Sequence, residues 1–171
     1  MHKKFVNSLY ISFILILISF SARSAEDLKS ISKFKDRETF TVTENNNKIC
    51  FAQSIPILRA PKKFERNPSR LFVSFRPTED IIDEISATSG YTFQKKKIVT
   101  AKTGKKTFDF YSEEDFAWIM DTEVEQQFIK AMKKASRVMI IGRTDKGKQT
   151  IDHYSLMGFS KAYTAAKKNC S

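Results

Sequence analysis

The sequence holds few of the residues from which catalytic and metal sites are usually built. It has two cysteines, Cys50 and Cys170, and two histidines, His2 and His153. No C-x-x-C pair is present to lower a thiol pKa, and no G-x-S-x-G segment marks a nucleophilic serine. The usual nitrogen and sulfur ligands are too few for a zinc site. These absences disfavour redox, zinc and serine-hydrolase chemistry, and we expect no cofactor.

The N-terminal apolar run is too short to span a bilayer. It extends from Leu9 to Phe20 and covers roughly 12 residues, whereas a transmembrane helix needs about 20. Lys3 and Lys4 precede it and the small-residue triplet 22–24 follows, the order typical of a secretory signal peptide. We therefore predict a cleaved signal peptide at residues 1–24 and an exported product with no transmembrane segment after cleavage.

The charge is strongly positive. The 171 residues carry a net charge of +11, and loss of residues 1–24 removes three of the 30 basic residues and none of the 19 acidic ones, which leaves +8. A surface of this sign attracts anionic partners such as lipid phosphates, acidic polysaccharides or nucleic acid. A merely well-solvated surface is the preferred interpretation, because net charge bears on solubility and association and not on fold or chemistry.

The two cysteines predict a disulfide. An even pair in an exported chain usually oxidises, and this bridge would enclose nearly the whole domain. In the chain-entropy model such a constraint contributes on the order of 4 to 5 kcal/mol. A redox pair and two free thiols are the alternatives, and the spacing disfavours the first.

Alternating apolar and polar residues predict short antiparallel strands. The expected strands are residues 38–43, 49–52, 70–76, 98–101, 107–111, 138–141 and 149–156, while residues 81–89 fit either a strand or a helical turn. Turn signals at residues 45–47 and 145–147 predict hairpins. Residues 25–37 are polar and predict a flexible segment. Three prolines within residues 56–68 predict a long basic loop without regular structure.

Two helices are expected, at residues 123–135 and 160–169. Thr122 and Glu125 have the spacing of a capping box, in which each side chain bonds the other residue's backbone N–H. Val124, Phe128 and Met132 recur at intervals of four, which gives the first helix an apolar stripe. The second helix would carry Cys170 to the core.

Two motifs suggest a phosphate-binding site and a catalytic site, of which the first is rejected and the second is disfavoured. Residues 142–148 match G-x-x-x-x-G-K of a phosphate-binding loop, but Gln149 follows instead of a magnesium-binding hydroxyl, and residues 150–156 alternate like a strand. A hairpin turn marked by Gly147 is the preferred interpretation. His153 stands beside Asp152, which leaves a hydrolytic triad open, but no serine lies in a recognisable nucleophile setting. An outward-facing strand residue is the preferred role of His153.

Acidic and aromatic residues at 112–118 have ordinary explanations. The cluster 112–115 lacks the ligand spacing of a calcium loop and predicts a solvated turn. Trp118, among Phe116 and Ile119, is interpreted as filling the core and not as a platform for a sugar or a base.

Lysine-rich corners supply the candidate contact surface. Its residues are Lys62, Lys63, Arg66, Lys95, Lys96 and Lys97. Further lysine pairs stand at residues 105–106 and 167–168, and the sequence does not decide whether all of these form one face or are scattered. No zinc knuckle, arginine-glycine run or aromatic-basic signature accompanies them, so sequence-specific nucleic-acid binding is disfavoured.

Several segments together resemble the invasion-associated locus B family of exported alphaproteobacterial proteins. The similar segments are CFAQSxP at 50–56, RxP at 66–68, FVSFRP at 72–77, GYxF at 90–93, FAW at 116–118, AMKK at 131–134, TxDxYSLxGF at 150–159, and Cys170. Their order and spacing cover roughly residues 40–170. The turn at 145–148 departs from the family, which commonly has an Arg-Gly turn there.

The resemblance implies a mainly β fold: an immunoglobulin-like antiparallel β-sandwich with one or two peripheral helices, here residues 38–171. It also implies the periplasm of a Gram-negative bacterium, joined cysteines and no established enzyme activity. We expect a non-catalytic binding or envelope-associated protein whose partners are anionic envelope components or another envelope protein. A periplasmic hydrolase acting on envelope polymers through His153 and an adhesin for anionic glycan or lipid are the alternatives.

Overall fold

The computed structural model describes residues 28–171, which form eleven strands, two α-helices and a short 3-10 turn at Pro77–Glu79. The predicted signal peptide lies outside the described residues. The strands are β1 (Lys29–Phe34), β2 (Arg37–Glu44), β3 (Asn47–Ser54), β4 (Leu58–Ala60), β5 (Arg70–Arg76), β6 (Ile81–Thr88), β7 (Val99–Thr103), β8 (Lys106–Glu113), β9 (Phe116–Trp118), β10 (Arg137–Arg143) and β11 (Gln149–Ser155). The helices are α1 (Thr122–Lys134) and α2 (Phe159–Asn169). The mainly β prediction with two helices is confirmed.

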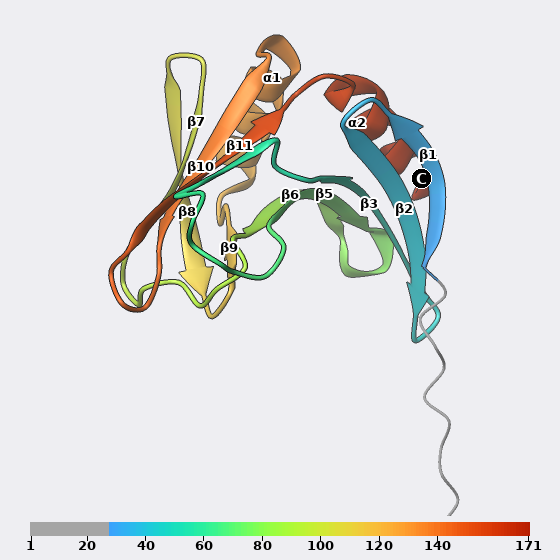
Figure 1. The fold of residues 1–171 in the computed structure, drawn as a ribbon. Helices are drawn as coiled ribbons and strands as arrows, with labels where there is room; N and C mark the ends of the chain where they lie inside the picture. Colours follow the sequence, from blue (N-terminus) through green and yellow to red (C-terminus); the bar gives the residue numbers. More distant parts are fainter. Residues whose placement is uncertain (1–27) are drawn as a thin grey trace, which may run out of the picture.

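All eleven strands belong to one antiparallel sheet in the order β1-β2-β3-β5-β6-β9-β8-β7-β10-β11-β4. Strand β8 joins its two halves, because residues 106–110 pair with β7 and residues 111–113 pair with β9. Figure 1 shows the half with β7, β8, β10 and β11 on the left and the half with β1, β2 and β3 on the right. The sandwich expected from the resemblance therefore takes the form of a continuous sheet folded at β8.

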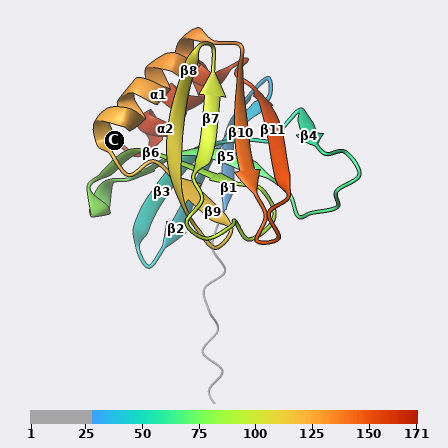
Figure 2. The same ribbon diagram turned by 90° about the vertical axis from the view of Figure 1, so that its left-hand side faces the viewer.

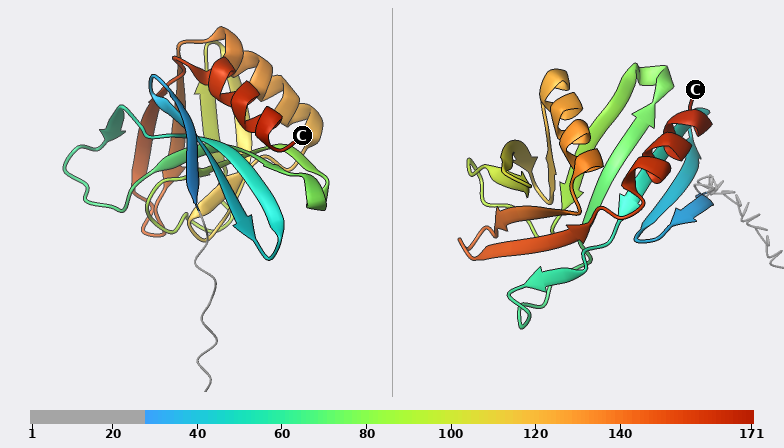
Figure 3. Two further views of the ribbon diagram at one scale, coloured as in Figure 1. Left: turned by 90° about the vertical axis from the view of Figure 1, so that its right-hand side faces the viewer. Right: turned by 90° about the horizontal axis from the view of Figure 1, so that it is seen from above.

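Both helices cover the same side of the sheet. Helix α1 packs on β6 and β8, and α2 packs on β1, β2, β3 and β5. Seen from above, the two helices lie side by side over the strands (Figure 3). Their apolar stripes meet the inward faces of both halves of the sheet, and the shared core includes Val73, Ile85, Phe110, Phe128 and Ile140, each at most 1% exposed.

The predicted disulfide is present between Cys50 on β3 and Cys170 just after α2. The Cα atoms of the two residues are 5.8 Å apart, and 120 positions separate them in sequence. Cys50 is fully buried. The bridge therefore fixes the last helix against the central part of the sheet.

Most predicted strands and helices are confirmed, with boundaries shifted by one or two residues. The exceptions are strands that form because the fold brings a partner strand beside them. Residues 81–88 form a strand. Within the predicted flexible segment 25–37, residues 29–34 form β1, because β2 offers them a pairing edge. Within the predicted structureless loop 56–68, residues 58–60 form β4, which pairs with β11. Both strands depend on a partner strand and not on their own pattern.

The predicted capping box at the start of α1 is wrong. The residue that caps this helix is Asp121, whose carboxylate accepts hydrogen bonds from the backbone N–H groups of Glu123 (2.8 Å) and Val124 (3.0 Å). Glu125 instead points into the fold and accepts a bond of 3.0 Å from the N–H of Ile85 on β6. Helix α2 starts at Phe159, after Gly158, one residue before the predicted start.

The burial of Glu125 makes stability depend on pH. Glu125 is only 7% exposed. This burial, with smaller contributions from the charges of Glu84 and Asp83, raises its pKa to about 7. Because the folded protein holds this proton more tightly than the unfolded chain does, the free energy of unfolding falls as pH rises from about 4.5 to about 7. We expect Glu125→Gln to remove this fall while keeping the oxygen that accepts from Ile85. Urea denaturation of both proteins across this range is the measurement, and parallel pH profiles would contradict the expectation.

Trp118 does not fill the core as predicted. It is half-buried on the outer face of the sheet, and Phe116 is 44% exposed. The residue between them, Ala117, points inward and is fully buried. The strand alternation of β9 therefore places the two large rings outside.

Candidate functional site

Two of the predicted lysine corners converge on the turn between β10 and β11. Figure 2 shows this turn at the lower end of the molecule, whereas the turn between β7 and β8 lies at the upper end. Residues 61–68 and 91–97 both pack against the lower turn. We call the surface that they form with residues 143–148 the basic end.

Residues 91–97 are held to the turn by backbone contacts. The N–H of Gln94 donates to the carbonyl of Arg143 at 2.9 Å, and the N–H of Asp145 donates to the carbonyl of Thr92 at 3.0 Å. Phe93 is buried and forms an isolated β-bridge with Thr144. The close approach requires Gly142, because a Cβ atom there would lie 2.7 Å from both the Phe93 ring and the Tyr91 hydroxyl.

The loop that carries Lys62 and Lys63 reaches the same turn through Phe64. The ammonium of Lys148 lies over the Phe64 ring, 4.2 Å from its centroid, and the Phe64 ring lies 6.2 Å from that of Tyr91. Such contacts between a cation and a ring contribute about 0.5–1 kcal/mol at exposed sites. Phe64 therefore links both lysine corners to the turn.

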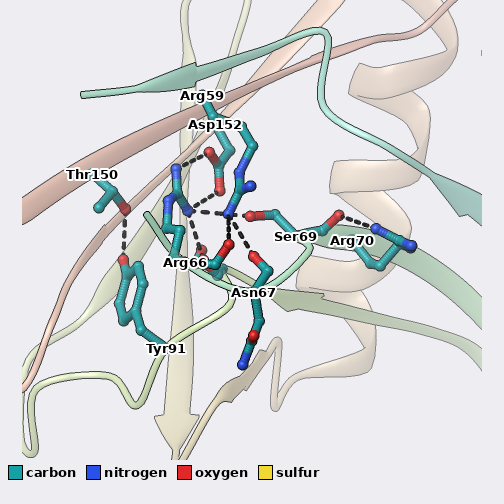
Figure 4. A network of polar contacts seen from close by, with 9 residues as sticks. Arg59, Arg66, Asn67, Ser69, Arg70, Tyr91, Thr150 and Asp152 are labelled. Atoms are coloured by element: carbon teal, nitrogen blue, oxygen red, sulfur yellow. Dashed lines mark hydrogen bonds and ion pairs between the residues drawn. The ribbon is translucent and has the colours of Figure 1, made fainter. Parts of the chain in front are cut away.

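A buried ion pair anchors this loop from below. The guanidinium of Arg66 bonds both carboxylate oxygens of Asp152 on β11, and both side chains are at most 1% exposed (Figure 4). The Nη1 atom of Arg66 also donates to the Ser69 hydroxyl at 3.1 Å and to the carbonyl of Ser89 at 2.6 Å. Arg59 donates to the carbonyl of Asn67. Loop, β11 and the end of β6 are thereby tied together without exposing the pair to water.

Tyr91 lies beside Arg66 and Asp152 in the layer beneath the basic end, which we call the buried frame. Its hydroxyl lies 2.6 Å from the Thr150 hydroxyl, and burial raises the pKa of the phenol, so it stays protonated at neutral pH. The preceding Gly90 has φ +78°, and a Cβ atom there would overlap the carbonyl of Asn67. Gly90 therefore lets the loop carrying Arg66 lie directly against the start of residues 91–97.

The surface above this frame is mainly cationic. Its exposed basic residues are Lys62, Lys63, Lys95, Lys96, Lys97, Arg143, Lys146 and Lys148, and the acidic residues Glu65, Glu114 and Asp145 lie in or beside the same segments. Among residues 28–171, the first five lysines form no ion pair. Their ammonium groups are therefore available to an anion in solution.

The structure corrects the predicted contact surface in one residue and extends it in three. Arg66 is removed, because its side chain is buried and its charge is matched by Asp152. Arg143, Lys146 and Lys148 are added, and they come from the stretch that mimics a phosphate-binding loop. That stretch is the predicted hairpin, with Gly147 at φ +80°. The lysine pairs at 105–106 and 167–168 lie elsewhere, beyond the other end of β7 and at the end of α2.

His153 and Asp152 do not form a catalytic pair. They are successive residues of β11 and therefore point to opposite faces of the sheet, and Asp152 is fully buried and bound to Arg66. The Nδ1 atom of His153 is buried and has no hydrogen-bond partner among the described residues. Asp152, the acid that the sequence offered for a triad, is therefore not available to His153.

No group of three or more His, Cys, Asp or Glu side chains within residues 28–171 is placed to hold a metal ion. None of the helices in this range has the length and hydrophobicity needed to cross a membrane.

Comparisons with known proteins agree with the geometry at the level of fold. No protein-family model matches the chain, and no curated protein matches its sequence. The chain is similar to the crystal structure of invasion associated protein B from Bartonella henselae, with a TM-score of 0.55 over 82% of this chain and 98% of that one, at 13% sequence identity. The chain thus shares the fold of invasion associated protein B, as its segment-by-segment resemblance implies.

Proposed function

We propose that this chain is an exported, envelope-associated binding protein, similar to the invasion-associated locus B family, that binds anionic polymers at its basic end. The observation that carries the proposal is the convergence of lysines from distant segments on one rigid turn. The buried pair of Arg66 and Asp152 holds these segments in place, and five lysines above it lack carboxylate partners among the described residues. Fixed, unpaired cations attract polyanions through summed charge.

Export and a periplasmic location form part of this proposal. The pattern of residues 1–24 supports export, and the bridge between Cys50 and Cys170 is compatible with an oxidising compartment. The fold likeness to an invasion associated protein supports a role at the envelope, and invasion itself is not carried over. The alternative of a hydrolase using His153 receives no support from the geometry, because Asp152 faces away from it.

Charge neutralisation at one corner tests the function. We expect Lys95→Gln, Lys96→Gln and Lys97→Gln together to weaken binding to a polyanion by about tenfold to a hundredfold at low salt, given about 1 kcal/mol for each lysine near an anionic surface. The measurements are the salt concentration that elutes the protein from heparin resin and its sedimentation with phosphatidylglycerol vesicles. The first reports a glycan and the second a lipid source of the anionic groups.

The matched control removes the same charge elsewhere. Lys102, Lys105 and Lys106 are exposed on and after β7, and their triple Gln variant has an identical net charge. The proposal predicts that this control elutes close to the wild type. Equal weakening in both triple variants would show that only net charge matters and would overturn the basic end as the site.

A further inference from the structure

A hollow of about 430 Å³ lies on the outer face of the other half of the sheet. Phe51, Phe72, Phe116 and Trp118, from β3, β5 and β9, line it. Its volume is within the range of small-molecule pockets, roughly 300–1,000 Å³. None of these rings is needed in the core, which lies on the opposite face of the same strands.

The register of the strands places a serine between the aromatic residues. Ser74 on β5 stands opposite Phe51 on one side and Glu84 on the other. Ser86 on β6 stands opposite Phe72 on one side and Trp118 on the other. Directly opposed residues of antiparallel strands point to the same face. Both serines therefore lie on the floor of the hollow, Ser86 between two rings and Ser74 between a ring and a carboxylate.

The two hydroxyls on this floor have no partner. Ser74 is 8% exposed and Ser86 is 9% exposed, yet neither hydroxyl makes a hydrogen bond to another described residue. Neither oxygen is among the fully buried unpaired polar atoms of residues 28–171, so both remain accessible from the hollow that they line. The floor thus offers two hydrogen-bonding groups to whatever enters the hollow.

A charged pair forms one wall. Arg76 bonds Glu84 through both of its terminal nitrogens, at 3.1 and 2.6 Å, and bonds Glu79 through Nε at 3.0 Å. Burial acts to lower the pKa of Arg76, but the bonds to Glu84 and Glu79 raise it overall. The pair is held in a fixed orientation, and its side chains are about a quarter exposed. Each carboxylate oxygen of Glu84 accepts one bond from Arg76 and can accept another from a ligand.

We propose that this hollow binds the ring of a neutral saccharide. A pyranose ring has an apolar face of C–H groups that packs on aromatic rings, and hydroxyls at its edge that both donate and accept. The four rings match the first property, and the unpaired serines with the Arg76–Glu84 wall match the second. The site is separate from the basic end and takes an uncharged ligand.

The same observations disfavour two other occupants. An acyl chain would bury the serine hydroxyls and the charged wall without satisfying them, at a cost of about 1–3 kcal/mol for each group. A second copy of the chain would have to fill a concave surface with a protruding segment. Titration with an acyl chain and sedimentation of the free protein distinguish these two occupants from a saccharide.

Trp118 is the only tryptophan in the chain, so its fluorescence reports on the hollow directly. The purified protein is titrated with maltotriose, cellotriose and triacetylchitotriose, all of them uncharged, up to about 10 mM, which covers dissociation constants in the millimolar range. Mannitol serves as a polyol without a ring face, and laurate as an acyl chain. We expect a saturable change with at least one trisaccharide and none with mannitol.

Two variants test the floor. Ser74→Ala and Ser86→Ala are each expected to weaken saccharide binding about fivefold, the effect of one lost hydrogen bond. Because neither hydroxyl has a partner in the fold, the melting temperature should stay the same. Ser160→Ala, on the exposed start of α2, is the matched control and should bind like the wild type.

Three results of the ligand titrations would overturn the proposal. They are saturable binding of laurate alone, no response to any trisaccharide, and saccharide binding that both serine variants leave unchanged. A fluorescence change that depends on protein concentration without ligand, accompanied by a dimer in sedimentation, would assign the hollow to a second copy and would also refute it.

Discussion

Removal of the disulfide is expected to lower the free energy of unfolding by about 4–5 kcal/mol. The bridge joins Cys50 to Cys170 across 120 positions, so the oxidised unfolded chain is a closed loop of almost the whole described domain. Opening that loop increases the entropy of the unfolded state. Since small domains are typically stable by about 5–15 kcal/mol, this loss is a large part of the total.

The measurement is chemical denaturation of Cys50→Ala with Cys170→Ala. Wild-type protein unfolded in the presence of a reductant is the control, because it loses the bridge and keeps both side chains. The two samples should share a lowered denaturation midpoint. If the reduced wild type kept the midpoint of the oxidised protein, the bridge would contribute nothing to stability.

Breaking the buried ion pair is expected to have the second largest effect. Asp152→Leu leaves the Arg66 guanidinium buried without a counter-charge, which costs about 3–5 kcal/mol. Arg66→Met with Asp152→Leu removes both charges and should recover much of this loss. Recovery should be incomplete, because the carbonyl of Ser89 also loses its donor.

A double-mutant cycle in urea measures the coupling between the two residues. The comparison pair is Arg76 and Glu84, which has similar bidentate geometry but side chains 23% and 28% exposed. For that pair we expect about 0–1 kcal/mol, because water screens it. Additive effects of the Arg66 and Asp152 substitutions would contradict the role assigned to their contact.

The ion-pair variants also connect stability to the proposed function. The pair ties the loop bearing Lys62 and Lys63 to β11, and the basic end lies above it. Asp152→Leu should therefore weaken retention on heparin resin although no surface lysine changes. Retention equal to the wild type would show that the loop keeps its position without the pair.

Local sequence pattern was sufficient for those elements that depend on neighbouring residues. The hairpin of β2 and β3 follows from alternating residues around consecutive asparagines, and both Asn45 and Asn46 adopt positive φ. The apolar stripe of α1 is likewise local, and Phe128 and Met132 are buried as expected. The disulfide follows from the count of cysteines.

Other features depend on partners distant in sequence. The length and positive charge of the loop at residues 56–68 place Arg66 on the predicted contact surface, and only the fold brings Asp152, 86 residues away, into contact with it. Asp121 caps α1 in place of Thr122, and Glu125 bonds to Ile85 on β6, 40 residues away, instead of completing a capping box. Neither choice is visible in the local spacing.

The aromatic hollow was missed for a related reason. Alternation in residues 70–76 shows two faces, but does not say which large residues on the second face remain accessible. Phe72 shares its face with Ser74 and Arg76, and this mixture of a ring, a hydroxyl and a cation was the available signal. The apolar neighbours Phe116 and Ile119 suggest an interior position for Trp118, whereas the small Ala117 is the residue that β9 directs inward.

The strand order also determines how the molecule resists self-association. A single continuous sheet has two edges, here β1 and β4, and each could template the pairing of another chain. Strand β4 has three residues and is followed by Pro61, and β1 is irregular between Ser30 and Ser32. Short or kinked edges recruit foreign strands poorly. Substitutions that straighten β1 or lengthen β4 would therefore promote fibrous assembly without altering the core.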